Sequence, residues 1–349
     1  MPAPTVPAPT VPAPVLLPLA LSLGDPAGIG PELIATAWAA RVELGLAPFV
    51  VAGGADVLRA AASTRGIELP VLLVATPAEA ADKFASALPV LAEVDDGIFT
   101  PGMPSAAGAA LALRSLERAT ALALSGAASG VVTAPVSKSE LAAVGFAFPG
   151  QTEFLADACG VTEEDAVMML AGPSLRTVPL TVHIALAEVS AHITADLILR
   201  RCRVIDAAMR RDFGLARPRL ALAGLNPHAG EKGRMGGEEQ AVIAPAIAQL
   251  QAEGIDATGP HPADTLFAPH KRDTYDVAVA MYHDQALVPL KTLDFDEGVN
   301  MTLGLPIIRT SPDHGTAFDI AGQGVARVNS LVAAIRLAGE AARHRAASL

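Results

Sequence analysis

The sequence predicts an α/β fold in which a mostly parallel sheet is covered by helices on both faces. Of the 349 residues, 51% are hydrophobic and only 17% are charged, so the chain can bury a large core. Short apolar runs alternate with longer amphipathic segments, which is typical of strands and helices that follow one another in α/β proteins. Several runs are continuously apolar and rich in Val and Leu, as expected for strands that helices cover on both sides.

The first residues do not belong to this pattern. Residues 2–14 read PAPTVPAPTVPAP, and proline removes backbone donors and favours extended conformations. We expect residues 1–14 to be a disordered, dispensable tail; a docking peptide is the alternative. The apolar stretch Val15–Leu23 has no positively charged flank, because the first basic residue is Arg41. We therefore expect a first buried strand there instead of a signal peptide, in a cytoplasmic protein.

Apolar runs that can form strands recur along the chain. They are Leu16–Leu23, Phe49–Ala52, Val71–Val74, Gly130–Thr133, Val167–Leu170, Thr177–His183, Arg219–Leu225 and Val277–Tyr282. Among the intervening helices, one is expected to be capped by Thr194, to run to about Phe213 and to stop at Gly214. Ser137 and Glu140 have the spacing of a capping box for another helix. In parallel sheets ligands bind beyond the carboxyl ends of strands, so polar clusters that follow strands are the candidates for a site.

Composition excludes several classes of function. The net charge of −11 opposes binding to nucleic acid and to anionic lipid. No apolar run reaches the ~20 residues that span a membrane. The two cysteines, Cys159 and Cys202, form no CxxC pair, so we expect two buried, reduced thiols.

Three histidines occupy matching positions directly after predicted strands. His183 ends TVPLTVH, His228 follows RLALAGL, and His283 follows YDVAVAMY. Three imidazoles that converge at one edge of a sheet can hold a divalent metal and leave a position open for substrate. Asp284 and Glu231 could orient these imidazoles. The alternative is three separate histidines with local hydrogen bonds, but their shared context favours the metal site.

Two further clusters can be interpreted in more than one way. The loop GDPAGIGPE (Gly24–Glu32) follows the first strand and opens a helix at Pro31. Its amides could face an anion, or it could be a structural turn; position 33 is Leu, so it is not the dinucleotide fingerprint. Lys138 in TAPVSKSEL could bind an anion or a carbonyl, or it could be a solvated lysine.

A last polar group contains scarce cations. Lys291, Asn300 and Arg309 lie close together in the sequence, and one lysine and one arginine beside an amide suit a phosphate or a carboxylate. The segment HGTAFDIAG (His314–Gly322) reads as a compact polar loop that enters a helix. Such a loop can hold a cofactor with backbone amides and side chains.

Taken together, these segments resemble the 4-hydroxythreonine-4-phosphate dehydrogenase family of pyridoxine biosynthesis. The blocks that carry the resemblance are GDPAGIGPE, TAPVSKSEL, GQTEF, LNPHAGEKGRMGGEE, PADTLF, AMYHDQALVPLK, GVNMTLGLPIIRTSPDHGTA and DIAGQG. They extend from about Leu19 to Val325. HGTAFDIAG also resembles the cofactor loop of isocitrate and isopropylmalate dehydrogenases, whose fold this family shares: three α/β/α layers in two lobes. The resemblance implies a first lobe of residues 15–138 plus 306–349 and a second lobe of residues 139–305.

The resemblance also implies an activity. An NAD- or NADP-dependent enzyme would oxidise 4-phosphooxy-threonine at C3, and the product would lose carbon dioxide to give 3-amino-2-oxopropyl phosphate. A divalent ion (zinc, magnesium or cobalt) would be held by His183, His228 and His283. The enzyme would be a homodimer with its site in the cleft and at the interface, where the partner subunit contributes one of these histidines.

Further roles carry over from the family by position. Substrate binding is implied for Gln151, Thr152, Asp264, Lys291, Asn300 and Arg309, and Lys291 is also a catalytic candidate. Cofactor binding is implied for His314, Gly315, Thr316 and Asp319. Many family members have His at the position of Gln151, and glutamine can donate a hydrogen bond but cannot titrate near neutral pH. The amino or hydroxy character of the substrate therefore stays open.

Other functions remain as alternatives. The nearest is a 3-dehydrogenase for a phosphorylated sugar acid, such as 4-phospho-threonate or 4-phospho-erythronate. A phosphate acyltransferase has a related architecture but needs neither the histidines nor a nicotinamide. A non-enzymatic metal- or anion-binding protein is the third alternative.

Overall fold

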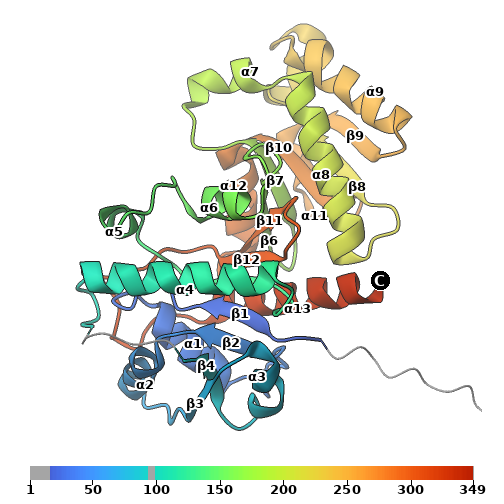
Figure 1. The fold of residues 1–349 in the computed structure, drawn as a ribbon. Helices are drawn as coiled ribbons and strands as arrows, with labels where there is room; N and C mark the ends of the chain where they lie inside the picture. The colour runs from blue at the N-terminus through green and yellow to red at the C-terminus, as the bar shows by residue number, and fades with distance from the viewer. Residues whose placement is uncertain (1–15, 93–98, 349) are drawn as a thin grey trace, which may run out of the picture.

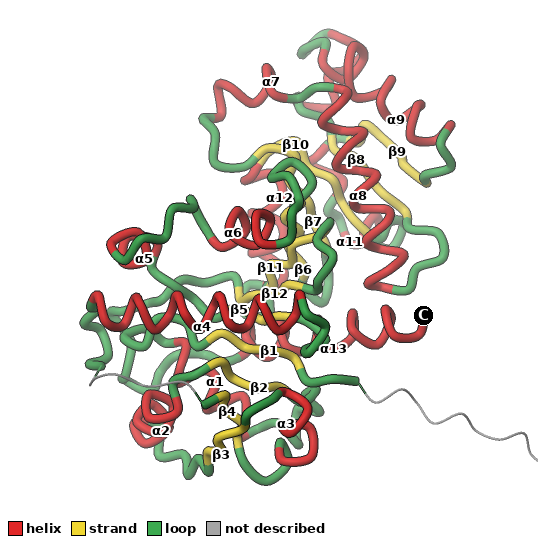
Figure 2. The backbone as a smooth tube through the Cα atoms, viewed as in Figure 1, coloured by secondary structure: helices red, strands yellow, loops and turns green. Residues whose placement is uncertain are grey.

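The structure is a computed structural model that describes residues 16–92 and 99–348 (Figure 1). The predicted disorder of residues 1–14 lies outside these residues. The described strands form one 12-stranded sheet in the order β3-β4-β2-β1-β5-β12-β11-β6-β7-β10-β8-β9. Figure 2 shows helices on both sides of the strands. The predicted α/β class with a mostly parallel sheet is confirmed.

The strands agree with most of the predicted apolar runs, and β2, β3 and β10 have the predicted bounds. The strands are β1 (Leu19–Ser22), β2 (Phe49–Ala52), β3 (Val71–Val74), β4 (Leu88–Leu91), β5 (Val131–Thr133), β6 (Val167–Ala171), β7 (Arg176–Thr181), β8 (Arg219–Ala223), β9 (Asp256–His261), β10 (Val277–Tyr282), β11 (Val299–Leu303) and β12 (Arg309–Pro312). The sequence does not predict β4, β9, β11 and β12, because each of these short strands contains proline or polar residues.

The helices cover the sheet and connect its strands. They are α1 (Gly30–Ala39), α2 (Ala55–Thr64), α3 (Pro77–Lys83), α4 (Ala106–Leu124), α5 (Lys138–Ala143), α6 (Gln151–Ala158), α7 (Val189–His192), α8 (Ala195–Phe213), α9 (Ala244–Ala252), α10 (Ala263–Leu266), α11 (Pro269–Arg272), α12 (His283–Asp294) and α13 (Asn329–Ala347), with short turns η1 (Leu186–Glu188), η2 (Pro227–Gly233) and η3 (Glu239–Ile243).

Local signals in the sequence determine where several helices begin and end. Thr194 Oγ1 accepts a hydrogen bond from Leu197 N at 3.2 Å, and Gly214 adopts a left-handed φ of 66° after the last turn of α8. Both ends of this helix are as predicted. Ser137 Oγ accepts from Glu140 N at 3.5 Å at the start of α5. Caps of this kind act within one turn of chain, so they can be predicted without knowledge of the tertiary structure.

Strand β1 shows how the layers are built. Leu19 and Leu21 point into a core that contains residues of α1 and α13, whereas Ala20 points into a core that contains residues of α4. Neighbouring side chains on a strand point to opposite faces, so the two cores lie on opposite sides of the sheet. All four residues of β1 are buried. Helices on both faces explain why the run is continuously apolar.

The sheet consists of two parallel halves that run in opposite directions. One half contains β3, β4, β2, β1, β5 and β12, and the other contains β7, β10, β8 and β9. Between them, β11 and β6 form antiparallel pairs with each other and with their outer neighbours β12 and β7. The carboxyl ends of β1 and β5 therefore lie at the edge opposite to those of β7, β8 and β10.

A buried ion pair holds the two halves together where the chain crosses between them. Asp212 on α8 is 1% exposed and accepts hydrogen bonds from Arg211 and from Arg345 on α13. The same two guanidiniums donate to the carbonyls of Leu305 and Pro306, in the segment between β11 and β12. Burial alone would raise the pKa of Asp212, but the hydrogen bonds from Arg211 and Arg345 lower it below its usual value.

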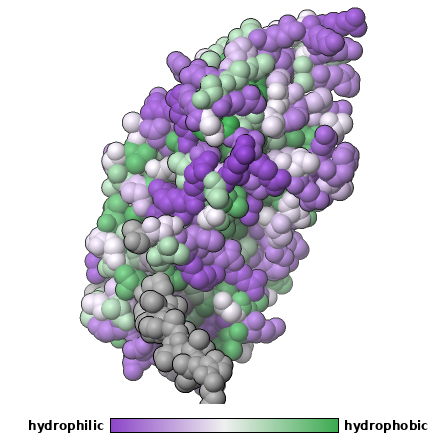
Figure 3. Space-filling view, turned by 90° about the vertical axis from the view of Figure 1, so that its right-hand side faces the viewer, coloured by the Kyte–Doolittle hydropathy of each residue, from purple (hydrophilic) through white to green (hydrophobic). Residues whose placement is uncertain are grey.

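Surface and cysteine features agree with the composition. Figure 3 shows hydrophilic side chains over much of one face, with hydrophobic ones scattered among them. None of the described helices is long and apolar enough to cross a membrane. Cys159 and Cys202 are both free, and burial raises the pKa of Cys202 to about 12. Cys202 is buried as predicted, whereas Cys159 is only partly buried.

Candidate functional site

A pocket of about 290 Å³ lies over the middle of the sheet, between its two halves. Its floor includes Leu170 on β6, Asn300 on β11 and Ser311 on β12, which are register partners and so share one face. Among the predicted site residues it is lined by Gln151, Thr152, His183, His283, Asn300, Arg309, His314 and Gly315. The pocket therefore lies over the face of the sheet and is not confined to one carboxyl edge.

Arg309 is the most deeply buried cation of the pocket, and it has only neutral partners. It begins β12 and is 4% exposed. Its Nη1 donates to Thr302 Oγ1 at 3.1 Å, and its Nη2 donates to Thr133 Oγ1 and to Gln151 Oε1, both at 3.0 Å. Burial lowers its pKa to about 10, an effect that the charge of Glu153 opposes, so the guanidinium is charged at neutral pH. No described carboxylate forms an ion pair with it.

The pocket also contains polar atoms without partners. Arg309 Nε, Asn300 Oδ1 and His314 Nε2 are buried and have no hydrogen-bond partner among the described residues. Such an atom costs about 1–3 kcal/mol when it stays unsatisfied. Three of them around one cavity indicate a site for a ligand with several polar groups, and the charge of Arg309 favours an anion.

Gln151 supports Arg309 from the start of α6. Its Oε1 accepts the bond from Arg309, and its Nε2 donates to the backbone oxygen of Ala134 at 3.2 Å. One of its two amide hydrogens is left for a ligand. Thr152, the next residue, is half-buried and lines the same pocket. Glutamine at this position therefore has a clear local role, which is to hold the guanidinium in place.

Lys138 also reaches the pocket, from the first residue of α5. A Cβ atom added to Gly150 would lie 3.6 Å from Lys138 Nζ, so the lysine extends towards the loop before α6. This position favours an interaction with a ligand over a purely solvated lysine.

The three histidines follow three neighbouring strands, as the sequence suggests. Strand β10 pairs in parallel with both β7 and β8, so His183, His283 and His228 leave the same edge of the sheet. The rings of His183 and His283 have centroids 6.0 Å apart, and both line the pocket. This separation is compatible with one ion at about 2.0–2.1 Å from a nitrogen of each ring. His283 Nδ1 lies 2.7 Å from Asp284 Oδ1, so Asp284 can orient this ring.

His228 does not join the other two within one chain. Among the described residues, no group of three His, Cys, Asp or Glu side chains is arranged to hold a metal ion. His228 is exposed on η2, which packs against α10, the helix of Asp264. Neither residue lines the pocket. Within one chain, the structure therefore brings His183 and His283 together at the pocket and leaves His228 apart from them.

Lys291 and the loop after β12 lie beside an adjoining pocket. Lys291 Nζ is 3.1 Å from Asp313 Oδ2, and this second pocket is also lined by His314 and Ile320. Asp313 and His314 line both pockets, whereas Asp319 is exposed. The loop continues as turns and does not enter a helix directly, since α13 begins only at Asn329.

The GDPAGIGPE loop is a structural turn that supports this second loop. Ala27 N donates to Asp25 Oδ1, Gly28 N donates to Asp25 O, and Ile29 N donates to Thr316 O, each at 3.0 Å. These amides are therefore not free to face an anion. A Cβ atom on Gly28 would lie 2.9 Å from Thr316 O, so the close approach of the two loops requires glycine.

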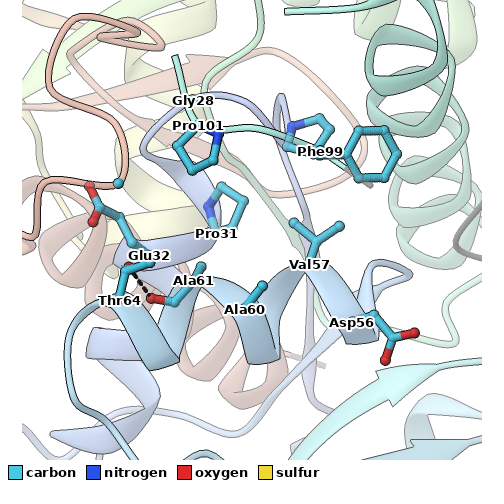
Figure 4. Close-up of a pocket in the computed structure, with 12 residues that line it drawn as sticks. Gly28, Pro31, Glu32, Asp56, Val57, Ala60, Ala61, Thr64, Phe99 and Pro101 are labelled. Atoms are coloured by element: carbon cyan, nitrogen blue, oxygen red, sulfur yellow. Dashed lines mark hydrogen bonds between the residues drawn. The ribbon is translucent and has the colours of Figure 1, made fainter. Parts of the chain in front are cut away.

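A separate apolar cavity of about 290 Å³ lies beside this turn (Figure 4). Pro31, Val57 and Pro101 line it, and Glu32 lies at its margin. Glu32 is 2% exposed, and burial raises the pKa of its carboxyl although the charge of Arg65 opposes this effect. The sequence gives no signal for this residue, because an acid in the first turn of a helix is common.

Comparison with known proteins matches residues 46–338 to the family described as "Pyridoxal phosphate biosynthetic protein PdxA". The chain is 62% identical over 329 residues to a 4-hydroxythreonine-4-phosphate dehydrogenase of Erythrobacter litoralis, covering 94% of this chain and 98% of the relative. It is 54% identical to the enzyme of the same name from Zymomonas mobilis over 330 residues, with 95% and 97% covered.

Solved structures agree with this match. A crystal structure of 4-hydroxythreonine-4-phosphate dehydrogenase from Klebsiella pneumoniae superposes with a TM-score of 0.84 at 42% identity, covering 94% of this chain and 99% of that one. A terephthalate 1,2-cis-dihydrodiol dehydrogenase from Burkholderia xenovorans reaches 0.65 at 33% identity, with 93% and 97% covered.

Proposed function

Since the chain belongs to the PdxA family of pyridoxal phosphate biosynthetic proteins, we propose that its central pocket carries the 4-hydroxythreonine-4-phosphate dehydrogenase reaction of that pathway. The observation that supports this use of the pocket is Arg309. A buried guanidinium with only neutral partners is a strong site for an anionic group of the substrate. Asn300 and Thr152 are placed to bind polar groups next to it.

A divalent ion (zinc, magnesium or cobalt) fits the donor set at the other end of the pocket. His183 and His283 of one subunit would hold it, and His228 of a second subunit would complete the site of a homodimer. The ion supplies positive charge that lowers the pKa of a substrate hydroxyl. The support is the 6.0 Å separation of the first two rings and the absence of His228 from the lining of this pocket in its own chain.

NAD or NADP would bind against the loop of His314, Gly315, Thr316 and Asp319, and it would supply the hydride acceptor. His314 Nε2 is a buried polar atom that has no hydrogen-bond partner among the described residues. The hydrogen bond from Ile29 N to Thr316 O fixes the position of the loop. His314 and Asp313 separate the two pockets, so a cofactor in one can approach a substrate in the other.

The protein's own residues would then direct the chemistry. Arg309 and Asn300 anchor an anionic end of the substrate and hold C3 in place, so that remote binding energy supports the reaction. The hydride leaves C3 and the hydroxyl loses its proton, which gives a β-keto acid that releases carbon dioxide. Lys291, at the margin between the pockets, would return a proton to the carbon that has lost the carboxylate. Glu153 lines the pocket and can pair with the substrate amine.

The chain would divide into two lobes. We place the lobes at residues 15–138 plus 306–349 and at residues 139–305, because the sheet changes direction at β11 and β6, next to this division. The expected setting is the cytoplasm. Asp264, exposed beside His228, would belong to the partner's side of the shared site.

The decisive assay is a panel of phosphorylated hydroxy acids tested for NADH and NADPH formation, with and without a chelator. We expect 4-phosphooxy-threonine to be the best substrate and chelation to stop the reaction. Higher kcat/KM with 4-phospho-threonate or 4-phospho-erythronate would reassign the substrate. Acyl transfer that chelation does not affect would indicate an acyltransferase.

Mixed dimers test the shared site. His183→Ala mixed with His228→Ala should recover activity, because one of the two sites then has all its wild-type ligands. His183→Ala mixed with His283→Ala should recover none, because these two ligands come from the same chain. Equal recovery in both mixtures would contradict this assignment.

A further inference from the structure

The chain that carries His228 adopts a rare backbone conformation. Residues His228, Ala229, Gly230, Glu231 and Lys232 all have positive φ, at 52°, 51°, 74°, 41° and 59°. Only glycine adopts this region freely, and other residues there cost about 1–3 kcal/mol each. Such a turn persists only where its surroundings determine it, so neighbouring contacts must stabilise it strongly.

Glu239 provides the main contacts. Its side chain is 3% exposed; Oε1 accepts from Asn226 N at 2.7 Å and Oε2 accepts from Asn226 Nδ2 at 3.0 Å. The carboxylate fills the inner side of the turn, because a Cβ atom on Gly230 would lie only 2.5 Å from Oε2 and one on Gly224 only 3.2 Å from Oε1. Glu239 thus determines where the chain leaves β8 and how closely it folds back.

Glu238 connects this turn to the segment that follows His183. Its Oε2 accepts from Asn226 Nδ2 at 2.8 Å, and its Oε1 accepts from Ser190 Oγ at 2.6 Å. The bond from Ser190, with backbone bonds and the bond from Asn226, lowers the pKa of Glu238. No described cation forms an ion pair with either glutamate. Their hydrogen bonds therefore act on Asn226, which leads to His228, and on the segment that follows His183.

A third link joins the chain of His283 to the same place. Gln285 is buried; its Nε2 donates to Gly224 O at 2.8 Å and its Oε1 accepts from Met281 N at 2.7 Å. It bridges the ends of β8 and β10, next to His283. The backbone positions of the three histidine segments are thus coupled by hydrogen bonds around Gly224 and Asn226.

We propose that Glu238 and Glu239 are positioning residues that hold Asn226 and thereby fix the turn that presents His228 to a divalent ion. This inference rests on the proposed function, because the orientation of His228 matters only if it binds a metal. Neither glutamate touches the ion in this scheme. They act through the backbone of the turn, as outer groups commonly do around metal ligands.

The test is Co²⁺ binding to the metal-free, full-length dimer, followed by its visible absorption spectrum and by equilibrium titration. Glu239→Gln keeps the size of the side chain and one acceptor for Asn226 N, but it places an NH2 group against Asn226 Nδ2. We expect it to weaken Co²⁺ binding by roughly 10- to 100-fold. Ser190→Ala removes only one bond to Glu238 and should weaken binding by a few-fold.

Asp212→Asn is the matched control, because it also removes a buried carboxylate that accepts several hydrogen bonds, but its partners are Arg211 and Arg345 and not the histidine segments. It should lower the melting temperature and leave Co²⁺ affinity unchanged. Wild-type affinity in Glu239→Gln, or an equal loss of affinity in Asp212→Asn, would overturn the inference. If Glu239→Gln does not fold, Glu238→Gln and Ser190→Ala decide by the same titration, and unchanged affinity in both overturns it.

The same titration separates this inference from the proposed function. A wild-type dimer that shows no Co²⁺ spectrum, or that binds Co²⁺ equally well after His283→Ala, would remove the metal site itself. Metal-dependent activity in the wild type together with unaffected glutamate variants would remove only the positioning role.

Discussion

Two regions of the molecule bury arginine in opposite ways. At the joint between the sheet halves, Arg345 is 19% exposed and lies 2.6 Å from the carboxylate of Asp212. In the central pocket, Arg309 is 4% exposed and contacts only two threonines and a glutamine. Both guanidiniums are largely removed from water, but only the first forms an ion pair; the charge that affects the pKa of Arg309 is that of Glu153, which does not bond to it.

The difference separates a structural charge from a functional one. Moving a charge out of water costs several kcal/mol, and a protein offsets this cost with a paired, hydrogen-bonded partner. Arg345 has such a partner and lies at the joint between the two halves of the sheet. Arg309 has no paired carboxylate, so the fold carries a buried charge that only neutral groups contact directly. A charge kept in this state is best explained by a ligand that supplies the missing anion.

The largest effect is expected from Arg309→Met. This change removes the charge and keeps much of the volume, so substrate affinity should fall by about 2–4 kcal/mol, roughly 30- to 1000-fold. The unfolding free energy should change much less than the substrate affinity, because the removal of a buried charge without an ion pair offsets the loss of three hydrogen bonds. Steady-state kinetics and denaturant unfolding measure the two quantities. A stability loss with normal KM would make Arg309 structural.

Arg309→Lys tests whether the positive charge alone determines substrate affinity. A lysine keeps the charge but cannot reproduce the planar guanidinium that contacts three acceptors. We expect affinity to remain well below that of the wild type. Full recovery of KM by lysine would show that charge alone determines binding.

Asp212→Asn should have the opposite profile. It leaves Arg211 and Arg345 without a carboxylate, so unfolding free energy should fall by about 2–3 kcal/mol while KM is unchanged. The pKa of Asp212 is lowered in the fold, so its stabilising contribution is present above its usual value of 3.8 and is lost as pH falls through the lowered pKa. Denaturant curves of both proteins should therefore converge in strong acid. A constant difference down to that range would contradict the ion-pair account.

A smaller effect is expected from Gln151→Ala. It removes one of three acceptors around Arg309 and the bond to Ala134, each worth about 0.5–1.5 kcal/mol. KM should rise several-fold and kcat should change little. Gln151→His, which keeps a polar ring that can hydrogen-bond at this position, should come closer to wild type. A loss of kcat alone in Gln151→Ala would instead indicate proton transfer at this position.

The smallest effect is expected from deletion of residues 1–14, which belong to neither region. Their repeated prolines remove backbone donors and favour extended conformations, so we expect them to contribute nothing to the packed core. Melting temperature and turnover should be unchanged within error. Reduced turnover after the deletion would show that the tail reaches the site.

The sequence predicts the parts of this fold that depend on local patterns. The bounds of β2 and α8 follow from a continuous apolar run and from a Thr and Gly at the helix ends. The positions of His183, His228 and His283 after strands follow in the same way. Each of these features is determined by residues within one or two turns of chain.

The remaining features depend on contacts between distant segments. Strand β12 is the polar run RTSP, and only its pairing with β5 and β11 makes it a strand. Arg309 therefore appears in the sequence as a residue after an apolar run, although it lies on the face of the sheet. The left-handed turn of His228 depends on Glu239, and no pattern in NPHAGE predicts its direction.

The placement of β12 has a consequence for the growing polypeptide on the ribosome. Arg309 on β12 bonds to Thr133 on β5 across 176 residues of chain. The ribosome adds about 5–20 residues per second, so β12 is synthesised roughly ten seconds or more after β5. During this time one edge of β5 has no strand beside it. Strands β6 to β10 emerge during this wait and can pair among themselves. The half of the sheet that begins the chain is thus the last to close, and nascent chains released before residue 312 leave it with an open edge.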